Sequence, residues 1–113
     1  MLALAVVCVL TPTKGWAFFI HGKEFLELCD SDDDGKRGMC GGIMVGAYGA
    51  YTLLSEDLKG YSSDGKKMCL PEEPDLIPAL KNLKLLLRAD ADLRSTDIMP
   101  LLFGIIEEFF VCK

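Results

Sequence analysis

The sequence predicts a small all-α protein, a four-helix bundle tied by two disulfides. Apolar residues recur at helical spacing after residue 17, and no segment has the strict alternation of a half-buried strand. Four cysteines remain in the same part of the chain, an even set that is typical of small exported proteins with disulfides. In two places an aspartate precedes a proline by three residues, a pattern that indicates a helix start.

The first 17 residues have the features of an export signal peptide. Residues 1–10 form an apolar run that is too short to span a bilayer. Gly15 and Ala17 supply the small side chains of a cleavage site, so we expect cleavage after Ala17 and a single helical domain over residues 18–113. No basic residue precedes the apolar run, and a buried N-terminal strand of the mature fold is the alternative interpretation. Cleavage would remove Cys8 and leave an even number of cysteines.

Two helices are expected in the first half of the mature chain. They cover about residues 23–28 and 40–56, and a charged loop over residues 30–38 joins them. Small residues lie four apart on the second helix, at Gly42, Gly46 and Ala50. Each interior glycine costs roughly 1 kcal/mol of helix propensity relative to alanine. We therefore expect another helix of the bundle to pack closely against this stripe.

Two further helices follow a polar, turn-rich loop at residues 59–67. Asp75 and Asp97 are expected to be their N-caps, which places a proline at the third helical position of each. The N–H at that position has no acceptor within the helix, so proline is tolerated there. The apolar stripes of these helices are Leu76, Leu80, Leu83 and Leu87, and Ile98, Leu102, Ile105, Phe109 and Cys112.

The cysteines after residue 17 are expected to form two intramolecular disulfides. They are Cys29, Cys40, Cys69 and Cys112. Four cysteines allow three pairings, and the sequence does not select among them. Pairing of Cys40 with Cys69 and of Cys29 with Cys112 is one of the three.

The chain is acidic, and its charge and hydropathy argue against nucleic acid and membranes as partners. The formal net charge is −5 and becomes one unit more negative when Lys14 leaves with the signal peptide. Lysine and arginine form no basic run, so we expect no nucleic acid and favour a basic protein surface as the partner. No other segment reaches membrane-spanning length without a charge, so we expect no membrane contact after cleavage.

The chain carries no clear catalytic constellation. His21 is the only histidine and lies close to the expected mature N-terminus, and the cysteines are better explained as cystines. Glu72 with Glu73, and Glu107 with Glu108, are neighbours in sequence, so the members of each pair do not face one another on a helix. We interpret them as solvent-exposed. The sequence therefore predicts no enzymatic activity and no cofactor.

The acidic segment Asp30–Gly35 partly resembles a calcium loop. Asp30, Asp32 and Asp34 stand at positions 1, 3 and 5 of an EF-hand-type loop, where alternate carboxylates converge on one cation. Gly41 stands at position 12, where a bidentate glutamate normally closes the site. We expect no metal site here, with the three aspartates as a weak candidate and a solvated acidic loop as the alternative.

Four motifs around the cysteines resemble one protein family. The motifs are residues 22–29 with Leu-x-x-Cys, 40–46 with Cys-x-Gly-x-x-x-Gly, 68–71 with Cys-x-Pro, and 106–113 with a Cys-Lys terminus. In this order they resemble the Rap/Tai family of periplasmic immunity proteins, which protect bacteria from type VI secretion peptidoglycan amidases. The resemblance covers nearly all of residues 20–113. The Asp30–Gly35 insert and Val111, where proline is common, depart from the pattern.

The resemblance implies both a function and a mechanism. It implies a helical, disulfide-bonded periplasmic protein, often a homodimer, that inserts a protruding loop into the catalytic cleft of an amidase. Two loops provide candidate partner-binding residues, namely Tyr61, Ser62, Ser63 and Asp64 in the first, and Asp90, Asp92 and Arg94 in the second. An exposed tyrosine is a typical interface anchor, which favours the first loop. The alternative function is that of a periplasmic structural or chaperone-like protein with no amidase partner.

Overall fold

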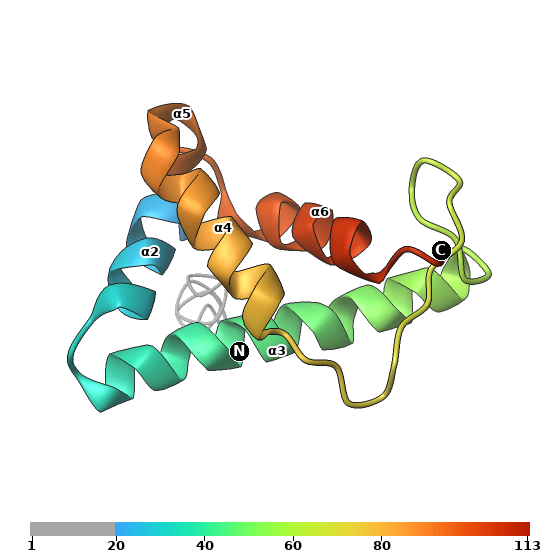
Figure 1. Cartoon of the computed structure of the whole chain (residues 1–113), viewed down its shortest axis with the longest axis horizontal. Helices are drawn as coiled ribbons and strands as arrows, with labels where there is room; N and C mark the ends of the chain where they lie inside the picture. The colour runs from blue at the N-terminus through green and yellow to red at the C-terminus, as the bar shows by residue number, and fades with distance from the viewer. Residues whose placement is uncertain (1–19) are drawn as a thin grey trace, which may run out of the picture.

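The computed structural model describes residues 20–113, which form helices and no strand. The helices are α2 (Gly22–Asp30), α3 (Asp34–Asp57), α4 (Ile77–Ala89), α5 (Ala91–Arg94) and α6 (Ile98–Phe110) (Figure 1). The prediction of an all-α fold is confirmed for this part of the chain. The predicted number of four helices was wrong, since α5 is a fifth helix. The expected signal peptide, residues 1–17, lies outside the described residues. None of the helices in residues 20–113 has both the length and the hydropathy needed to cross a bilayer.

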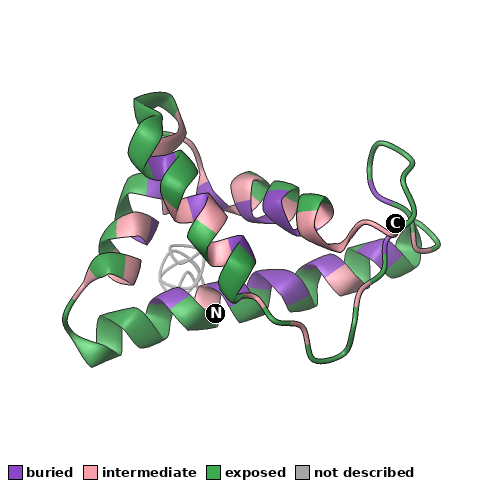
Figure 2. Cartoon of the chain, viewed as in Figure 1, coloured by how far each residue is buried: buried purple, intermediate pink, exposed green. Residues whose placement is uncertain are grey.

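The core lies among α2, α3, α4 and α6. α2 and α6 both contact α3, while α4 packs on α6, α5 and α2. Buried positions on α3, α4 and α6 face one another across this layer (Figure 2). The largest fully buried side chains are Phe25, Met44, Tyr51, Leu83, Leu87, Ile98, Leu102 and Ile106. Each contributes about 1.5–3 kcal/mol through burial. Leu83 and Leu87 of the stripe predicted for α4, and Ile98, Leu102 and Ile105 of the stripe predicted for α6, are buried. The placement of Cys112 on the buried face of the last helix was wrong, because α6 ends at Phe110.

α3 begins earlier than the sequence predicted. It starts at Asp34, so the second half of the expected loop over residues 30–38 is helical and the loop prediction was wrong there. Asp33 is the N-cap, and its carboxylate accepts a hydrogen bond from the Lys36 amide at 2.9 Å. The aspartate run resembles a turn in sequence, but an aspartate at this position satisfies a first-turn amide and starts the helix.

α6 begins where the sequence predicted. Asp97 is its N-cap and accepts a hydrogen bond from the Met99 amide at 3.2 Å. Pro100 therefore occupies the third helical position, where its missing N–H removes no hydrogen bond.

α4 begins one residue away from the expected position. Its N-cap is Leu76, so Pro78 occupies the second helical position rather than the third. Asp75 still contributes, because its carboxylate accepts a hydrogen bond from the Ile77 amide at 3.1 Å.

Two disulfides fix the chain, as predicted. Cys29 pairs with Cys40 and joins α2 to α3, whereas Cys69 pairs with Cys112 and joins the segment after the 59–67 loop to the C-terminus. The pairing of Cys40 with Cys69 is therefore not the one adopted. Each disulfide has a Cα–Cα distance of 5.0 Å.

The small-residue stripe of α3 is not a packing site within residues 20–113. A Cβ atom added at Gly42 or at Gly46 would meet no atom within 4 Å, and both glycines are exposed, as is Ala50. The prediction that another helix of the bundle covers this stripe was wrong for the described part of the chain, because the core forms on a different side of α3.

Candidate functional site

Residues 59–67 form a loop, here called the 59–67 loop, that protrudes beyond the C-terminal end of α3 (Figure 1). The chain reverses at two glycines in the left-handed region, Gly60 with φ 85° and Gly65 with φ 86°, a conformation that side chains with a Cβ rarely adopt. Across the loop the Ser62 amide donates to the Lys66 carbonyl at 2.6 Å. The loop is therefore a closed turn with its own backbone hydrogen bonds.

One carboxylate of α6 holds the loop against the core. Oε2 of Glu107 accepts hydrogen bonds from the Ser63 amide at 3.2 Å and from the Ser63 hydroxyl at 3.3 Å. The same oxygen accepts a hydrogen bond from the hydroxyl of Tyr51 on α3 at 2.8 Å. Burial first, and then this hydrogen bond, raise the pKa of Tyr51 above its ordinary value, so the hydroxyl stays a donor. Glu107 thus connects α3, α6 and the loop.

The base of the loop is tied to the C-terminus. The Met68 amide donates to the Gly60 carbonyl at 2.8 Å, and the Cys112 amide donates to the Lys67 carbonyl at 2.9 Å. The Cys69–Cys112 disulfide joins the same two segments covalently. Both ends of the loop are therefore held by bonds within the chain.

The four predicted residues of this loop have different roles. Tyr61 is 45% exposed and makes no side-chain hydrogen bond within residues 20–113. Ser62 is buried, and its hydroxyl donates to Asp64 and accepts from the Lys66 amide at 3.0 Å, so it shapes the loop. Ser63 and Asp64 are exposed. The hydrogen bond from Ser62 is the main cause of a lowered pKa of Asp64, which keeps this carboxylate charged.

The second predicted loop is mostly a short helix. Asp90 is the N-cap of α5 and accepts a hydrogen bond from the Asp92 amide at 2.9 Å. The Arg94 guanidinium donates to the carbonyls of Leu87 at 2.7 Å and Arg88 at 2.9 Å. Arg94 therefore satisfies the last carbonyls of α4. These bonds give Asp90 and Arg94 structural roles and leave Asp92 as an exposed side chain.

The structure does not bring the two predicted loops together. α5 and the 59–67 loop lie at opposite ends of the molecule (Figure 1). Beside the 59–67 loop is a cavity of about 340 Å³, whose charged lining residues are Asp64, Lys66, Glu107 and Glu108. The carboxylates outnumber the single lysine, so the lining of this cavity is acidic.

Glu107 is the site residue that sequence reasoning missed. Its interpretation as solvent-exposed was wrong, because its side chain is partly buried between the loop and α3. The available signal was Tyr51, a tyrosine within the apolar stripe of α3, since a buried tyrosine hydroxyl normally requires a hydrogen-bond partner.

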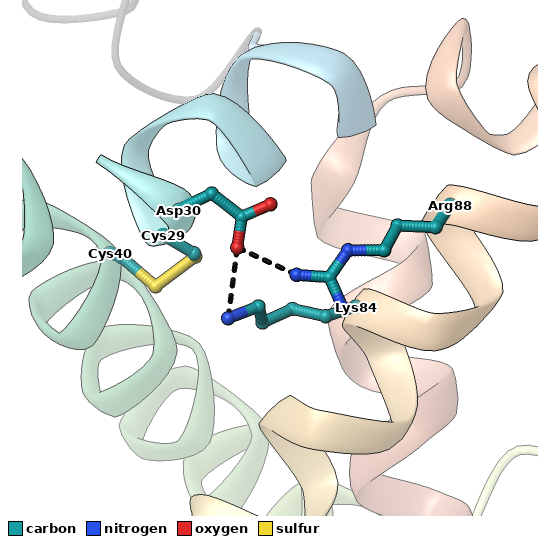
Figure 3. The surroundings of a disulfide bond; sticks show 5 residues. All are labelled: Cys29, Asp30, Cys40, Lys84 and Arg88. Atoms are coloured by element: carbon teal, nitrogen blue, oxygen red, sulfur yellow. Dashed lines mark hydrogen bonds and ion pairs between the residues drawn. A yellow bond between two sulfur atoms is a disulfide. The ribbon is translucent and has the colours of Figure 1, made fainter. Parts of the chain in front are cut away.

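The weak calcium candidate is not assembled as a cation site. Asp30 ends α2, and its Oδ1 lies 3.0 Å from the Lys84 ammonium and 2.8 Å from the Arg88 guanidinium of α4 (Figure 3). Asp34 lies in the first turn of α3, where it pairs with Arg37. Asp32 is exposed between the two helices. Residues 20–113 contain no group of three or more His, Cys, Asp or Glu side chains placed to hold a metal ion.

The site therefore consists of the 59–67 loop, its anchor Glu107 and the disulfide at its base. Comparison of the chain with protein-family models, with curated proteins and with solved structures found no match.

Proposed function

We propose that this protein is a periplasmic, non-enzymatic inhibitor of a type VI secretion peptidoglycan amidase, and that the 59–67 loop enters and occludes the catalytic cleft of that enzyme. The proposal starts from the resemblance of the cysteine motifs to Rap/Tai immunity proteins. The observation that carries it furthest is the fixed, protruding loop on which Tyr61 is exposed.

A fixed loop is well suited to occlusion. Ordering a flexible loop on binding costs roughly 0.5–1.5 kcal/mol for each immobilised side chain, which weakens association. Here Glu107, the backbone bonds at the base and the Cys69–Cys112 disulfide order the loop before it meets a partner. Inhibition then needs shape and contact area but no chemical step from this chain.

The charge of the site selects a class of partner surface. Asp64, Glu107 and Glu108 line the cavity beside the loop, with Lys66 as the only basic lining residue. Such a surface attracts basic side chains on the rim of an amidase cleft and increases the rate of encounter at low salt. Binding should therefore weaken as ionic strength rises.

The test of the function is genetic and biochemical. The protein is expressed together with each small Cys/His amidase encoded beside its gene, and binding and rescue from lysis are both measured. We expect one such amidase to bind and cells expressing this protein to survive it. If no neighbouring amidase binds, and cells lacking the protein survive every such effector, the structural or chaperone-like alternative replaces the proposal.

The test of the site is the substitution Tyr61→Ala. A buried tyrosine anchor contributes about 2 kcal/mol or more, so affinity for the amidase should fall roughly thirtyfold while the thermal midpoint stays nearly unchanged. Leu85→Ala is the matched control, because Leu85 is also an exposed apolar residue, 63% exposed, but lies on α4. Equal affinity losses in both variants would rule out the 59–67 loop as the contact.

A further inference from the structure

The chain between the 59–67 loop and α4 forms an arch beside α3. Residues 68–76, here called the 68–76 arch, leave the base of the loop at the C-terminal end of α3 and reach α4 near the middle of α3 (Figure 1). Side chains of the arch and of α3 line a groove of about 660 Å³. That volume lies within the range of about 300–1,000 Å³ that is typical of ligand sites.

Bonds within the chain fix the shape of this groove. The Cys69–Cys112 disulfide ties one end of the arch to the C-terminus. Near its middle, the Tyr48 hydroxyl of α3 donates a hydrogen bond to the Pro71 carbonyl at 2.5 Å. Burial raises the pKa of Tyr48, so the hydroxyl stays protonated and remains a donor. Pro71 and Pro74 also restrict the backbone of the arch, so a ligand has little of this wall to order on binding.

The groove is apolar along its base and at one end. Tyr48 and Met68, which line it, are only 6% and 7% exposed. Val45 lines the groove at the middle of α3 and is 63% exposed. A large apolar side chain that is exposed at a concave surface is available to an apolar group of a ligand.

Carboxylates on the two walls make the groove acidic. The charged lining residues are Glu56 from α3 and Glu72 from the arch, and both are exposed. Neither of them forms an ion pair with another residue of the described chain. An apolar base below two negative charges selects a ligand that is both apolar and cationic.

The length of the groove suits an extended peptide. Its lining residues on α3 run from Val45 to Glu56, a distance of about 16 Å along the helix axis. An extended chain rises about 3.3 Å per residue, so roughly five residues cover this distance. A lysine or arginine in such a segment would lay its aliphatic stem on the apolar base and keep its charged head at the rim.

We propose that this groove binds an extended segment of a protein partner, about five residues long. The segment places an apolar side chain beside Val45 and a lysine or arginine at the acidic rim formed by Glu56 and Glu72. The argument uses neither Tyr61 nor the amidase, so this site and the proposed inhibition can fail independently.

The first experiment measures binding of the purified protein to a positional-scanning library of acetylated and amidated hexapeptides, by fluorescence polarisation. We expect the tightest binders to combine an apolar residue with lysine or arginine, with a Kd of about 100 µM or tighter. Pools with aspartate or glutamate in place of the basic residue should bind at least tenfold more weakly. A library without a binder below about 1 mM would overturn the proposal, as would equal binding of the acidic pools.

The second experiment locates the bound peptide with Gly49→Phe. Gly49 lines the groove, and a Cβ atom there would meet no atom within 4 Å, so the ring enters the groove without displacing its own chain. Affinity for the tightest library peptide should fall at least tenfold, while the lost glycine keeps the thermal midpoint equal or higher. Gly38→Phe is the control, since Gly38 is equally open and exposed on α3 but does not line the groove. Native affinity in Gly49→Phe, or the same loss in both variants, would place the peptide elsewhere and refute the site.

The third experiment tests the charges with the double substitution Glu56→Gln and Glu72→Gln. Exposed ion pairs are weak, so affinity for the same peptide should fall about five- to tenfold, and most of the dependence of binding on salt should disappear. Glu27→Gln is the control, because Glu27 is an exposed carboxylate on α2 and its loss should leave the affinity unchanged. Unchanged affinity and salt dependence in the double variant would contradict recognition of a basic side chain.

Discussion

Glu107 is the residue on which both the core and the 59–67 loop depend. Its Oε2 accepts hydrogen bonds from Tyr51 in the core and from Ser63 in the loop. A shared acceptor of this kind couples the position of the loop to the packing of α3 on α6, since none of the three groups can move without leaving a donor unpaired.

Replacing Glu107 with alanine should therefore destabilise the protein. The buried Tyr51 hydroxyl loses its acceptor, so the free energy of unfolding should fall by about 1–3 kcal/mol in urea denaturation. Hydrogen exchange at the Ser63 amide should accelerate in the same variant. Glu108→Ala is the control, because Glu108 is exposed and its loss should change stability by about 0.5 kcal/mol or less. The same loss in both variants would contradict the proposed role of Glu107.

Asp30 makes a different contribution, through an ion pair at the surface. Partial burial raises the pKa of Asp30, but hydrogen bonds and charges from Lys84 and Arg88 outweigh it, so the pKa lies below its ordinary value. A carboxyl whose pKa is lowered by folding stabilises the folded state above the unfolded pKa. That contribution disappears as the pH falls through the lower pKa of the folded state.

The stability lost in Asp30→Asn should accordingly depend on pH. The Asp30 side chain is 39% exposed, so solvent screening limits the contribution to about 0.2–1 kcal/mol at pH 7. The ordinary pKa of aspartate is about 3.9, so the difference from the native protein should shrink below about pH 4 and vanish once the pH falls below the lowered pKa of the folded state. Urea denaturation across this range measures it, with the exposed Asp32→Asn as control. A difference that grows on acidification would have the wrong sign.

At the scale of elements, the two disulfides close loops of very different length. Cys29 and Cys40 are 11 residues apart and fasten the short connection between α2 and α3. Cys69 and Cys112 are 43 residues apart and enclose α4, α5 and α6. Closing a longer loop removes more conformational entropy from the unfolded chain.

Removing the two disulfides should therefore have unequal effects. The chain-entropy model gives upper values of about 4.0 kcal/mol for the Cys69–Cys112 bond and about 2.8 kcal/mol for the Cys29–Cys40 bond. The double substitution Cys69→Ser with Cys112→Ser should lower the free energy of unfolding more than Cys29→Ser with Cys40→Ser. Calorimetry of both variants under identical conditions measures the difference. A larger loss from the shorter loop would show that strain or packing, and not loop length, controls the effect.

Element boundaries were predictable where one local signal dominated. α6 follows directly from the Asp97 cap and its proline at the third position. The start of α3 was not predictable in this way, because the aspartate run before it also fits a calcium loop. Only the contacts of these aspartates in the fold show whether each one caps a helix or could bind a cation. Asp33 caps α3, while Asp30 is held by α4, a helix far away in sequence. α5 was missed because a four-residue helix has no periodicity to detect.

For the whole molecule, the sequence predicted the helical class and the two disulfides but not the arrangement. Periodicity identifies an apolar stripe without saying what covers it, so Gly42 and Gly46 were assigned to the core although their face lies outside it. The disulfide pairing likewise depends on which helices are neighbours. The exposed side of the candidate site, with Tyr61, was predictable from turn residues, whereas its support by Glu107 required the three-dimensional contact with Tyr51.

In the 59–67 loop, the groups that fix the backbone conformation differ from the side chains that the loop exposes to solvent. Its shape depends on backbone groups, the inward Ser62 hydroxyl and Glu107. Tyr61 and Lys67 pair through their backbones and leave their side chains to the solvent. New side chains at these two positions would change the exposed surface of the loop without altering the bonds that fold it. Under the proposed function, the same scaffold would acquire a different target through substitutions at these two positions.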